Sequence, residues 1–488
     1  MENGLAARNG GRVGLAALAA ILLLGIGLRF GEAWDGRAPV YDAAAYAAIA
    51  ANLDRGDGFT VGAAATQPSS NYSPGLSLLV AGAYEVTGGI HERTARVLLA
   101  LIGSLAILFT YLLARRLALL SINGPQRVTK STVAGLIGAA AVAIYPALLE
   151  YQGMLMSEPL AATLLSGAVL AMLWANDAGG APASGHSGEG GLRAGRCVRS
   201  RPPSPDRPLV RWLLPGVLLG ALAMVRPEYL GVALLLGVVV FVSGVRDGWR
   251  GALARGAVLL AGVVVIVAPW TIRNAVALDR AVPISTGGGQ VLFAGSYLPS
   301  DGDPEKVGSE VVARHPGLFD PDDAERLRLE QILARLAAAR YPQLESDRAL
   351  SRMGKDQLWD DVSEEPLEYA GFVATKIGRI WSHGPRAVMR EPGWEALHWA
   401  LVGFGLLGLA VLAWRRRWEA LVLATVFASI TALSALLVAS PRRVLVMVPL
   451  VAALAGVGAV WAWGAALGRR RNDASPDETP DSLSPGRT

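Results

Sequence analysis

The stretch VLLALIGSLAILFTYLLA, residues 97–114, holds no charged side chain, although Arg96 and Arg115 border it on either side. As an α-helix, a stretch of this length rises about 27 Å. That rise nearly matches the roughly 30 Å thickness of the hydrocarbon core of a bilayer. The stretch therefore predicts a transmembrane helix, and comparable stretches along the chain decide the fold class.

Charge-free runs of this kind recur along the whole chain. The ten runs are Val13–Leu28, Val97–Ala114, Ser131–Leu149, Pro159–Asn176, Trp212–Val225, Tyr229–Val245, Gly256–Ile272, Ala396–Trp414, Ala420–Pro441 and Val444–Leu467. The fifth is the shortest, and only Arg226, Pro227 and Glu228 separate it from the sixth. The composition agrees, since 17% of the residues are charged, against about 25% in soluble proteins. We expect an all-α polytopic membrane protein with about ten transmembrane helices.

Basic residues gather in alternate connecting segments, for example 193–211 and 415–417. Cytoplasmic loops of membrane proteins carry such an excess of arginine and lysine. The pattern predicts a multi-pass protein of the cell membrane with both termini in the cytoplasm. It also accounts for the net charge of +5, so we expect no nucleic-acid partner.

This topology divides the chain into modules and places two long segments outside the cytoplasm. The segment 177–211 and the tail 472–488 contain too few apolar residues to fold. The predicted modules are an N-terminal transmembrane module 13–272 that includes the extracytoplasmic loop 29–96, a disordered cytoplasmic loop 177–211, a mainly helical extracytoplasmic segment 273–395, C-terminal transmembrane helices 396–467 and a disordered cytoplasmic tail 472–488.

The two outer segments contain helical patterns of their own. Ala43–Leu53 is rich in alanine, and Ser73–Tyr84 is apolar but too short to span, so we expect the latter to lie in the membrane interface. Asp322–Arg340 predicts one exposed amphipathic helix, and Glu365–Ser382 predicts another that leads back to the membrane.

Motifs of several enzyme classes are absent from the sequence. It contains no GxxxxGK[ST] phosphate loop, no HExxH, no CxxC and no GxGxxG after a strand, which leaves an ATPase, a zincin or a soluble nucleotide-sugar enzyme without motif support. Four of the histidines, which we expect at the surface or the interface, lack metal-ligand spacing: His91, His315, His383 and His398.

Asp42 follows the outer end of the first run. Its carboxylate has two interpretations. It caps the helix that starts there, or it acts as a general base at the membrane surface, with Tyr46 one helical turn later on the same face as a substrate contact.

Glu158 stands at the outer end of the fourth run, directly before Pro159. One interpretation is a carboxylate that is stabilised by the dipole of its helix. The other is a second site carboxylate that faces Asp42 across a shared outer cavity, as a metal ligand or as an acid at the donor site. Glu150 is the fallback for this role.

Three arginines lie in short outer loops, against the trend for basic residues. Arg226 either pairs with Glu228 or binds substrate phosphate. Arg442 and Arg443 either extend to lipid headgroups or hold the phosphate of a lipid-linked substrate, for which guanidinium groups are well shaped.

A fourth arginine, Arg273, follows the seventh run at the interface and is a further candidate for substrate binding. The glycines 287–289 come shortly after it. They either form a turn or let backbone N–H groups approach an anion.

Several of these motifs occur in a characteristic order along the chain. They are VYDAAAYAAIAANLDRGDGF (40–59), NYSPGLSLLVAGAY (71–84), YPALLEYQGMLMSEPLA (145–161), LAMVRPEYLG (222–231), APWTIRNAVALDRAVPISTGGGQ (268–290), EPLEYAGFVATKIGRIW (365–381) and SPRRVLVMVPLVAALAG (440–456). In their order, sidedness and spacing they resemble the GT-C glycosyltransferase superfamily, in particular its bacterial protein mannosyltransferase and aminoarabinose transferase branch.

The resemblance implies a GT-C-like bundle that transfers sugar from a polyprenyl-phosphate donor on the extracytoplasmic face, with inversion. The acceptor is a protein, a lipid or a glycan. The family's first-loop acid falls on Asp42, its acid at the start of the fourth span on Glu158, and its late arginine on Arg442 or Arg443. Many relatives carry two adjacent acids where this chain has Asp42 alone, which leaves open whether Asp42 and Glu158 hold a divalent metal ion.

Two other classes of function compete with a transferase. A transporter or flippase of a lipid-linked sugar places ionisable residues near the middle of the bilayer, whereas here the charges gather at the outer face. A membrane assembly protein requires an exposed apolar patch on the helix Asp322–Arg340 and no cavity at Asp42.

Overall fold

The structure is a computed structural model that describes residues 2–36, 38–61, 67–124, 126–177, 209–382, 384 and 386–473. Apart from an isolated bridge between Thr60 and Pro68, the regular structure within these ranges is helical. Nine of the described helices are long and apolar enough to cross a membrane, and Leu209–Val225 is a shorter apolar helix. The chain is therefore an all-α, multi-pass membrane protein, as the charge-free runs predict.

The α-helices in chain order are α1 Glu2–Trp34, α2 Asp42–Asp54, α3 Pro74–Thr87, α4 Glu92–Ser121, α5 Arg127–Ile144, α6 Pro146–Gly153, α7 Ser157–Asp177, α8 Leu213–Val225, α9 Tyr229–Gly244, α10 Trp249–Leu278, α11 Gly288–Ser296, α12 Val307–Arg314, α13 Asp323–Arg326, α14 Leu329–Arg340, α15 Ser346–Glu364, α16 Pro366–Ser382, α17 Pro392–Trp414, α18 Trp418–Leu436 and α19 Arg442–Asp473. Four short 3₁₀ helices lie between them: η1 Leu209–Trp212, η2 Val245–Asp247, η3 Leu298–Ser300 and η4 Ala387–Arg390.

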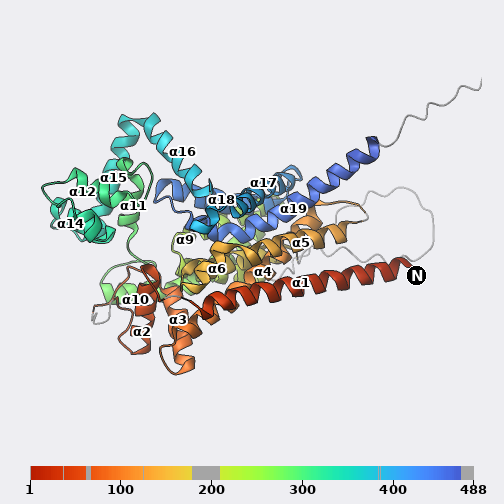
Figure 1. The fold of residues 1–488 in the computed structure, drawn as a ribbon, viewed down its shortest axis with the longest axis horizontal. Helices are drawn as coiled ribbons and strands as arrows, with labels where there is room; N and C mark the ends of the chain where they lie inside the picture. The colour runs from red at the N-terminus through yellow and green to blue at the C-terminus, as the bar shows by residue number, and fades with distance from the viewer. Residues whose placement is uncertain are drawn as a thin grey trace, which may run out of the picture.

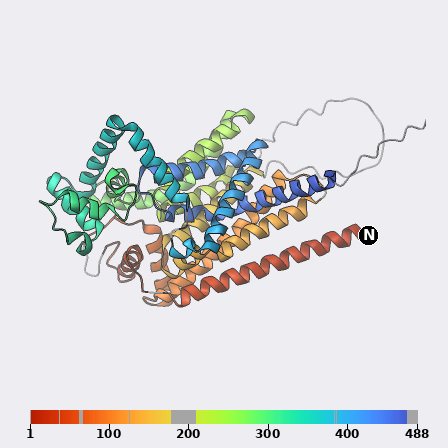
Figure 2. The same cartoon turned by 45° about the horizontal axis from the view of Figure 1, so that its top comes forward.

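The spans run side by side, and the helices outside them gather at one end of the bundle (Figure 1). We call this end, which carries α2, α3 and α11–α16, the site end. The start of α1 and the last turns of α19 both lie at the opposite end (Figures 1 and 2). The start of the first helix and the end of the last helix thus lie at the same end of the bundle.

The centre of the bundle is formed by α7 and α19, the two most buried of the candidate spans. Glycines bring α19 close to its neighbours: a Cβ at Gly456 would lie 2.1 Å from the carbonyl oxygen of Ala134 on α5, and one at Gly458 equally close to that of Phe404 on α17. Small residues are how helices in membranes achieve this contact. The start of α19 is thereby held rigidly at the site end.

The third charge-free run, Ser131–Leu149, contains the expected span as α5, but the run is not one helix. Pro146 has no N–H group and crowds the preceding turn, so α5 stops at Ile144 and the short helix α6 follows. The side chain of Arg29 on α1 donates to the carbonyl oxygens of Val142 at 2.9 Å and Ala143 at 3.2 Å. It thereby satisfies acceptors at the end of α5 that would otherwise face lipid or protein unpaired.

Helices α11, α12, α14 and α15 of the outer segment share a second apolar core, which includes Phe293, Val311, Leu333 and Leu350. The expected single helix Asp322–Arg340 is broken into α13 and α14, because the backbone is extended at Leu327 and Arg328. The break lets Leu327 as well as the apolar face of α14 pack on this core. That face is buried rather than exposed, contrary to what an assembly protein requires.

Other expectations have mixed outcomes. Ala43–Leu53 and Ser73–Tyr84 are helical as α2 and α3, and Glu365–Ser382 is helical as α16. His398, expected at the surface or the interface, is buried, with its ring nitrogens 3.0 Å from the Tyr145 hydroxyl and 2.9 Å from the Trp381 carbonyl oxygen. Nearly all of the loop 177–211 and of the tail 472–488, together with His383, lies outside the described residues.

Candidate active site

Six charged side chains meet at the site end of the bundle, and we call them the charge cluster. They come from the start of α2, the start of α7, the α8–α9 connection and the start of α19. The charge cluster consists of Asp42, Glu158, Arg226, Glu228, Arg442 and Arg443. Three carboxylates therefore face three guanidinium groups, and the cluster is balanced in charge.

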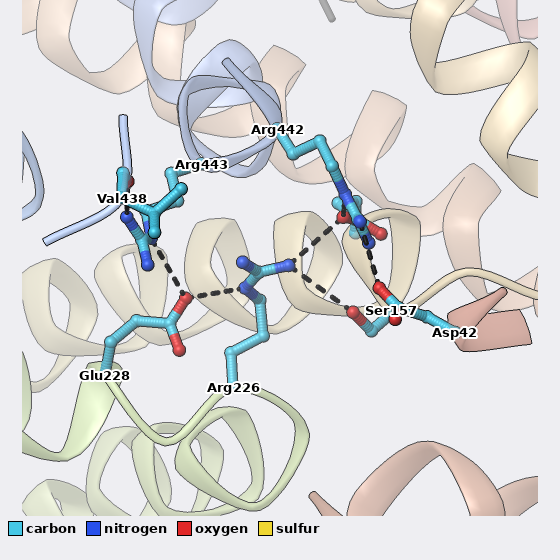
Figure 3. Close-up of polar contacts among 8 residues, drawn as sticks. Asp42, Ser157, Arg226, Glu228, Val438, Arg442 and Arg443 are labelled. Atoms are coloured by element: carbon cyan, nitrogen blue, oxygen red, sulfur yellow. Dashed lines mark hydrogen bonds and ion pairs between the residues drawn. The ribbon is translucent and has the colours of Figure 1, made fainter. Parts of the chain in front are cut away.

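Arg442 connects the two carboxylates that the sequence singles out (Figure 3). Its Nε donates to Glu158 Oε1 at 2.6 Å, and its Nη1 donates to Asp42 Oδ2 at 3.0 Å. Asp42 and Glu158 thus share one site, as expected, but a guanidinium group lies between them.

Arg226 joins the other half of the charge cluster to the same carboxylate. It donates to Glu158 Oε1 at 3.2 Å, to Ser157 Oγ at 3.4 Å and to Glu228 Oε1 at 2.8 Å (Figure 3). Arg443 lies on the far side of Glu228, at 3.8 Å, and donates to the carbonyl oxygen of Val438. The pairing of Arg226 with Glu228 is therefore present, and it exists together with a contact to Glu158.

A cavity of about 400 Å³ opens beside the charge cluster. Its polar lining consists of Asp42, Tyr46, Ser73, Ser157, Arg226, Glu228, Gln290, Ser440, Arg442 and Arg443. Val291 and Ala294 of α11 also line it, so the outer segment forms part of its wall. Asp42 and Arg442 are the members with the most exposed side chains, 39% and 31%, and they are therefore the charged groups that a ligand in the cavity meets first.

Glu158 lies behind the wall of this cavity rather than in it. Its side chain is fully buried, and Oε2 has no hydrogen-bond partner among the described residues. A buried carboxylate oxygen without a donor is costly. Glu158 is thus placed to orient Arg442 and Arg226, not to contact a ligand directly.

The helix-cap interpretation of Asp42 is wrong. The capping position is Tyr41, no side chain caps the helix, and Asp42 is the first residue of α2. Tyr41 has φ 52° and ψ −124°, a conformation that costs a non-glycine residue roughly 1–3 kcal/mol. This strained residue turns the chain so that the Asp42 carboxylate faces α19.

Tyr46 lines the cavity one turn after Asp42 and is 8% exposed. Its ring packs edge-on against Tyr72 at 5.7 Å. Burial and, to a lesser degree, the Asp42 carboxylate raise the pKa of Tyr46 to about 12. The hydroxyl therefore stays protonated and can donate a hydrogen bond to an oxygen in the cavity.

The carboxyl of Glu228 stays ionised in the cluster. Burial opposes its ionisation, but the guanidinium groups of Arg226 and Arg443 outweigh burial and hold the pKa of Glu228 below its ordinary value. Burial likewise opposes the charge of Arg226, and Glu228 and Glu158 overcome it and raise the pKa of Arg226. The Glu228 carboxyl and the Arg226 guanidinium are therefore not sources of protons near neutral pH.

Arg273 is not brought together with the other candidates. It donates to the backbone oxygens of Ser69 at 3.0 Å and Phe59 at 3.2 Å, and it lies 4.9 Å from the centre of the Trp270 ring. These contacts tie the first outer segment to the end of α10. The position does not line the Asp42 cavity.

The glycines 287–289 form a turn whose backbone is already engaged. Gly287, with φ 97°, precedes α11, and Gly289 N–H donates to Asp347 Oδ1 at 2.9 Å. The start of this helix is thus capped by a side chain of the protein.

The sequence does not single out several residues of the site, among them Gln290 and Glu228. Gln290 lines the cavity from a segment more than 200 residues from Asp42. No sequence pattern around Gln290 indicates a site residue. Glu228 was named only as a partner of Arg226, although a carboxylate in a short loop between two apolar runs is itself a signal.

The candidate metal ligands do not fit a metal ion in this arrangement. Both oxygens that Asp42 and Glu158 direct toward each other accept from Arg442. Within the described ranges, no group of three or more His, Cys, Asp or Glu side chains is placed to hold a metal. The positive charge between the two carboxylates is supplied by arginine.

No family model and no curated protein matches the sequence. Solved structures of low sequence identity do match the fold. The oligosaccharyltransferase AglB of Archaeoglobus fulgidus, in complex with an inhibitory peptide and a dolichol-phosphate, has 17% identity and a TM-score of 0.51 over 95% of this chain and 52% of its own. The same enzyme in complex with Zn and sulfate has 14% identity and a TM-score of 0.52 over 93% of this chain and 50% of its own.

A structure of ArnT from Cupriavidus metallidurans bound to undecaprenyl phosphate also matches, with 15% identity and a TM-score of 0.38 over 95% of this chain and 81% of its own. The fold assignment rests on the oligosaccharyltransferase structures, of which this chain spans about half the length. The helical fold that the sequence resemblance implies is thereby confirmed.

Proposed function

We propose that the protein is an inverting glycosyltransferase of the cell membrane. It moves a sugar from a polyprenyl-phosphate donor to an acceptor hydroxyl on a protein, a lipid or a glycan. The cavity beside the charge cluster is the active site and faces the extracytoplasmic side. The observation that carries the proposal is the Asp42–Arg442 pair on the cavity wall, which places a base directly beside a cation.

In this reaction the acceptor oxygen attacks the anomeric carbon while Asp42 takes the hydroxyl proton. The bond from that carbon to the phosphate oxygen breaks, and its electron pair leaves with the lipid phosphate. General-base assistance of this kind contributes about 10²- to 10⁴-fold. Arg442 stabilises the negative charge that grows on the phosphate, and the Tyr46 hydroxyl donates to an oxygen of the sugar or the phosphate.

The balanced charge of the cluster suggests an order of binding. Arg442 already bonds to Asp42 Oδ2, so this oxygen is not open to an acceptor hydroxyl. A donor phosphate is negatively charged and can accept two parallel hydrogen bonds from the guanidinium group, a bidentate contact that the single bond to Asp42 does not provide. Arg442 then turns from Asp42 to the phosphate, and the base becomes available only when the donor is bound.

A lipid-linked donor suits the location of the cavity. The cavity lies where the spans α8 and α19 meet the outer segment, so a polyprenyl chain can remain in the bilayer while its phosphate reaches Arg442. The archaeal oligosaccharyltransferase of the same fold is described in complex with a dolichol-phosphate, which supports a donor of this chemical class. The excess of basic residues in loops at the opposite end supports a site outside the cytoplasm.

Transfer in proteoliposomes tests the proposal. A short-chain polyprenyl phosphate that carries a tritiated hexose or a tritiated pentose is supplied with an extract of envelope acceptors. We expect the full-length protein to transfer one of these labels and Asp42→Asn to lose at least about 100-fold in rate. Asp54→Asn, at the other end of α2, is the matched control and keeps the rate.

Two outcomes would contradict the proposal. Full transfer by Asp42→Asn removes Asp42 as the base. If the labelled lipid crosses the bilayer in the presence of the protein and no label reaches any acceptor, the protein is a flippase instead.

A further inference from the structure

A second cavity, of about 650 Å³, lies between α4, α7 and α8. We call it the α4–α7 groove. Its lining is almost entirely apolar and includes Phe109, Leu112, Leu170, Leu214 and Leu218. Leu112 and Leu214 are 36% and 49% exposed. Within the membrane, an apolar groove with such open sides is a place for a hydrocarbon chain.

Three arginines surround one end of the α4–α7 groove. Arg115 and Arg116 of α4 line it directly, and the guanidinium of Arg211 lies 4.9 Å from the centre of the ring of Trp174, which also lines it. Arg116 donates to the carbonyl oxygen of Leu173. The Nε of Arg115 is buried and has no hydrogen-bond partner among the described residues.

No acidic residue is present in the described lining of the groove. Arg115 and Arg211 therefore meet no carboxylate in the described wall of the groove. A tryptophan together with arginines is typical of the level where lipid headgroups lie. The groove thus combines an apolar channel with a positively charged end at headgroup depth.

The α4–α7 groove is separate from the site around Asp42. Glu158 stands at the start of α7 and Trp174 near its end, and a helix of that many residues rises about 24 Å. The groove's charged end therefore belongs to the opposite leaflet. It lies at the end of the bundle where α1 starts and α19 ends. A ligand there cannot contact the charge cluster.

We propose that the α4–α7 groove binds one anionic phospholipid of that opposite leaflet. An acyl chain lies along the leucines, and the phosphate accepts hydrogen bonds from Arg115 and Arg211. Basic pockets between spans select anionic headgroups in this way, and guanidinium groups bind phosphate with two parallel bonds. A zwitterionic lipid fills the apolar channel equally well but gains less from the arginines, because its own cation is repelled.

The measurement is retention of lipid by the full-length protein. The purified protein is equilibrated with mixed micelles of equal parts phosphatidylglycerol and phosphatidylcholine, and the lipids that stay bound are counted by native mass spectrometry. We expect the wild type to retain phosphatidylglycerol preferentially. Arg211→Gln should lower this preference about fivefold, and Arg115→Gln with Arg211→Gln should lower it further by a similar factor.

Arg250→Gln is the matched control. Arg250 is exposed, lies over the ring of Trp249 at 5.4 Å and starts α10 at the same end of the bundle, but it does not line the groove. Arg250→Gln should keep the wild-type preference. Arg115→Lys, which retains the charge, should keep most of it and shows whether a loss comes from charge or from a disturbed helix.

The proposal fails if the wild type has no preference for phosphatidylglycerol, or if Arg250→Gln lowers the preference as much as Arg211→Gln does. Arg211 lies on η1 outside the packed spans, so its variant remains informative even if Arg115→Gln does not fold. None of these outcomes depends on glycosyl transfer. A failure of the lipid proposal therefore leaves the proposed function unaffected, and the reverse also holds.

Discussion

Arg442 Nη1 lies 3.0 Å from Asp42 Oδ2, although the two residues are 400 positions apart in the chain. The contact joins a helix of the first outer segment to the most buried span. Arg442 at the same time holds Glu158. One guanidinium group thus fixes the position of the base that we propose and occupies the place where a substrate phosphate would bind.

The two neighbouring arginines should behave differently toward the donor. Arg442→Ala should lower kcat/KM for the polyprenyl-phosphate donor about 100-fold, because a charge-assisted phosphate contact is lost. Arg443, which is held by Val438 and Glu228, should affect the donor KM by no more than about threefold when changed to Ala. Donor titrations of the two variants in proteoliposomes distinguish them, and equal effects would refute the assignment of the phosphate to Arg442.

Removing the buried carboxylate should destabilise the protein. Glu158→Gln leaves Arg226 and Arg442 without a shared partner, and breaking a buried ion pair costs roughly 3–5 kcal/mol. Glu150→Gln is the matched control, since Glu150 pairs with Arg386 in a contact that is about one-third exposed and is worth about 1 kcal/mol or less. Thermal unfolding in detergent should show a clear loss of Tm for Glu158→Gln alone; equal Tm values for the two variants would contradict the buried role.

The position of the spans was predictable because lipid leaves a chain few alternatives to apolar helices. The break of the third run was also written in the sequence, since Pro146 cannot continue a helix. Because the whole run lacks charged residues, the pattern nevertheless favoured one continuous helix. The break in Asp322–Arg340, by contrast, arises from packing of Leu327 on a core of distant residues, which no local pattern encodes.

The site was predictable in its members but not in its connections. A carboxylate or an arginine is conspicuous in a chain with so few charges, so position along the chain indicates Asp42, Glu158 and the pair of Arg442 and Arg443 as candidates. The choice between Arg442 and Arg443 required the structure. Adjacent residues of an α-helix point about 100° apart, so only the orientation of α19 decides that one faces Asp42 and the other Glu228.

Arg29 should be needed for stability although it does not line the Asp42 cavity. Its guanidinium is 2% exposed and donates to the carbonyl oxygens at the end of α5. Arg29→Met should leave these acceptors unpaired, at a cost of about 1–3 kcal/mol for each buried group. Arg93→Met, which removes an arginine that lies over the Trp34 ring, is the control. A wild-type Tm for Arg29→Met would mean that water or lipid replaces the lost donors.

Lys376 should make the stability of the outer segment depend on pH. It is 1% exposed and donates to the carbonyl oxygen of Gly295 at 2.6 Å. Burial, with a smaller contribution from Arg443, lowers the pKa of Lys376 to about 7, whereas an unfolded lysine has a pKa of about 10.4. Between these values the unfolded chain binds one more proton than the folded chain, so the free energy of unfolding should rise with pH.

The rise should begin near pH 7, continue toward pH 10 and amount to at most about 1.4 kcal/mol per pH unit. Below pH 7 both states hold the proton, and Lys376 contributes no further change. Tm measured at pH 7 and pH 9 should therefore increase more in the wild type than in Lys376→Met. Lys355→Met, which removes an exposed lysine of α15, should keep the wild-type increase. The same increase in Lys376→Met would assign the pH dependence to another group, because the methionine variant has no proton to release at that position.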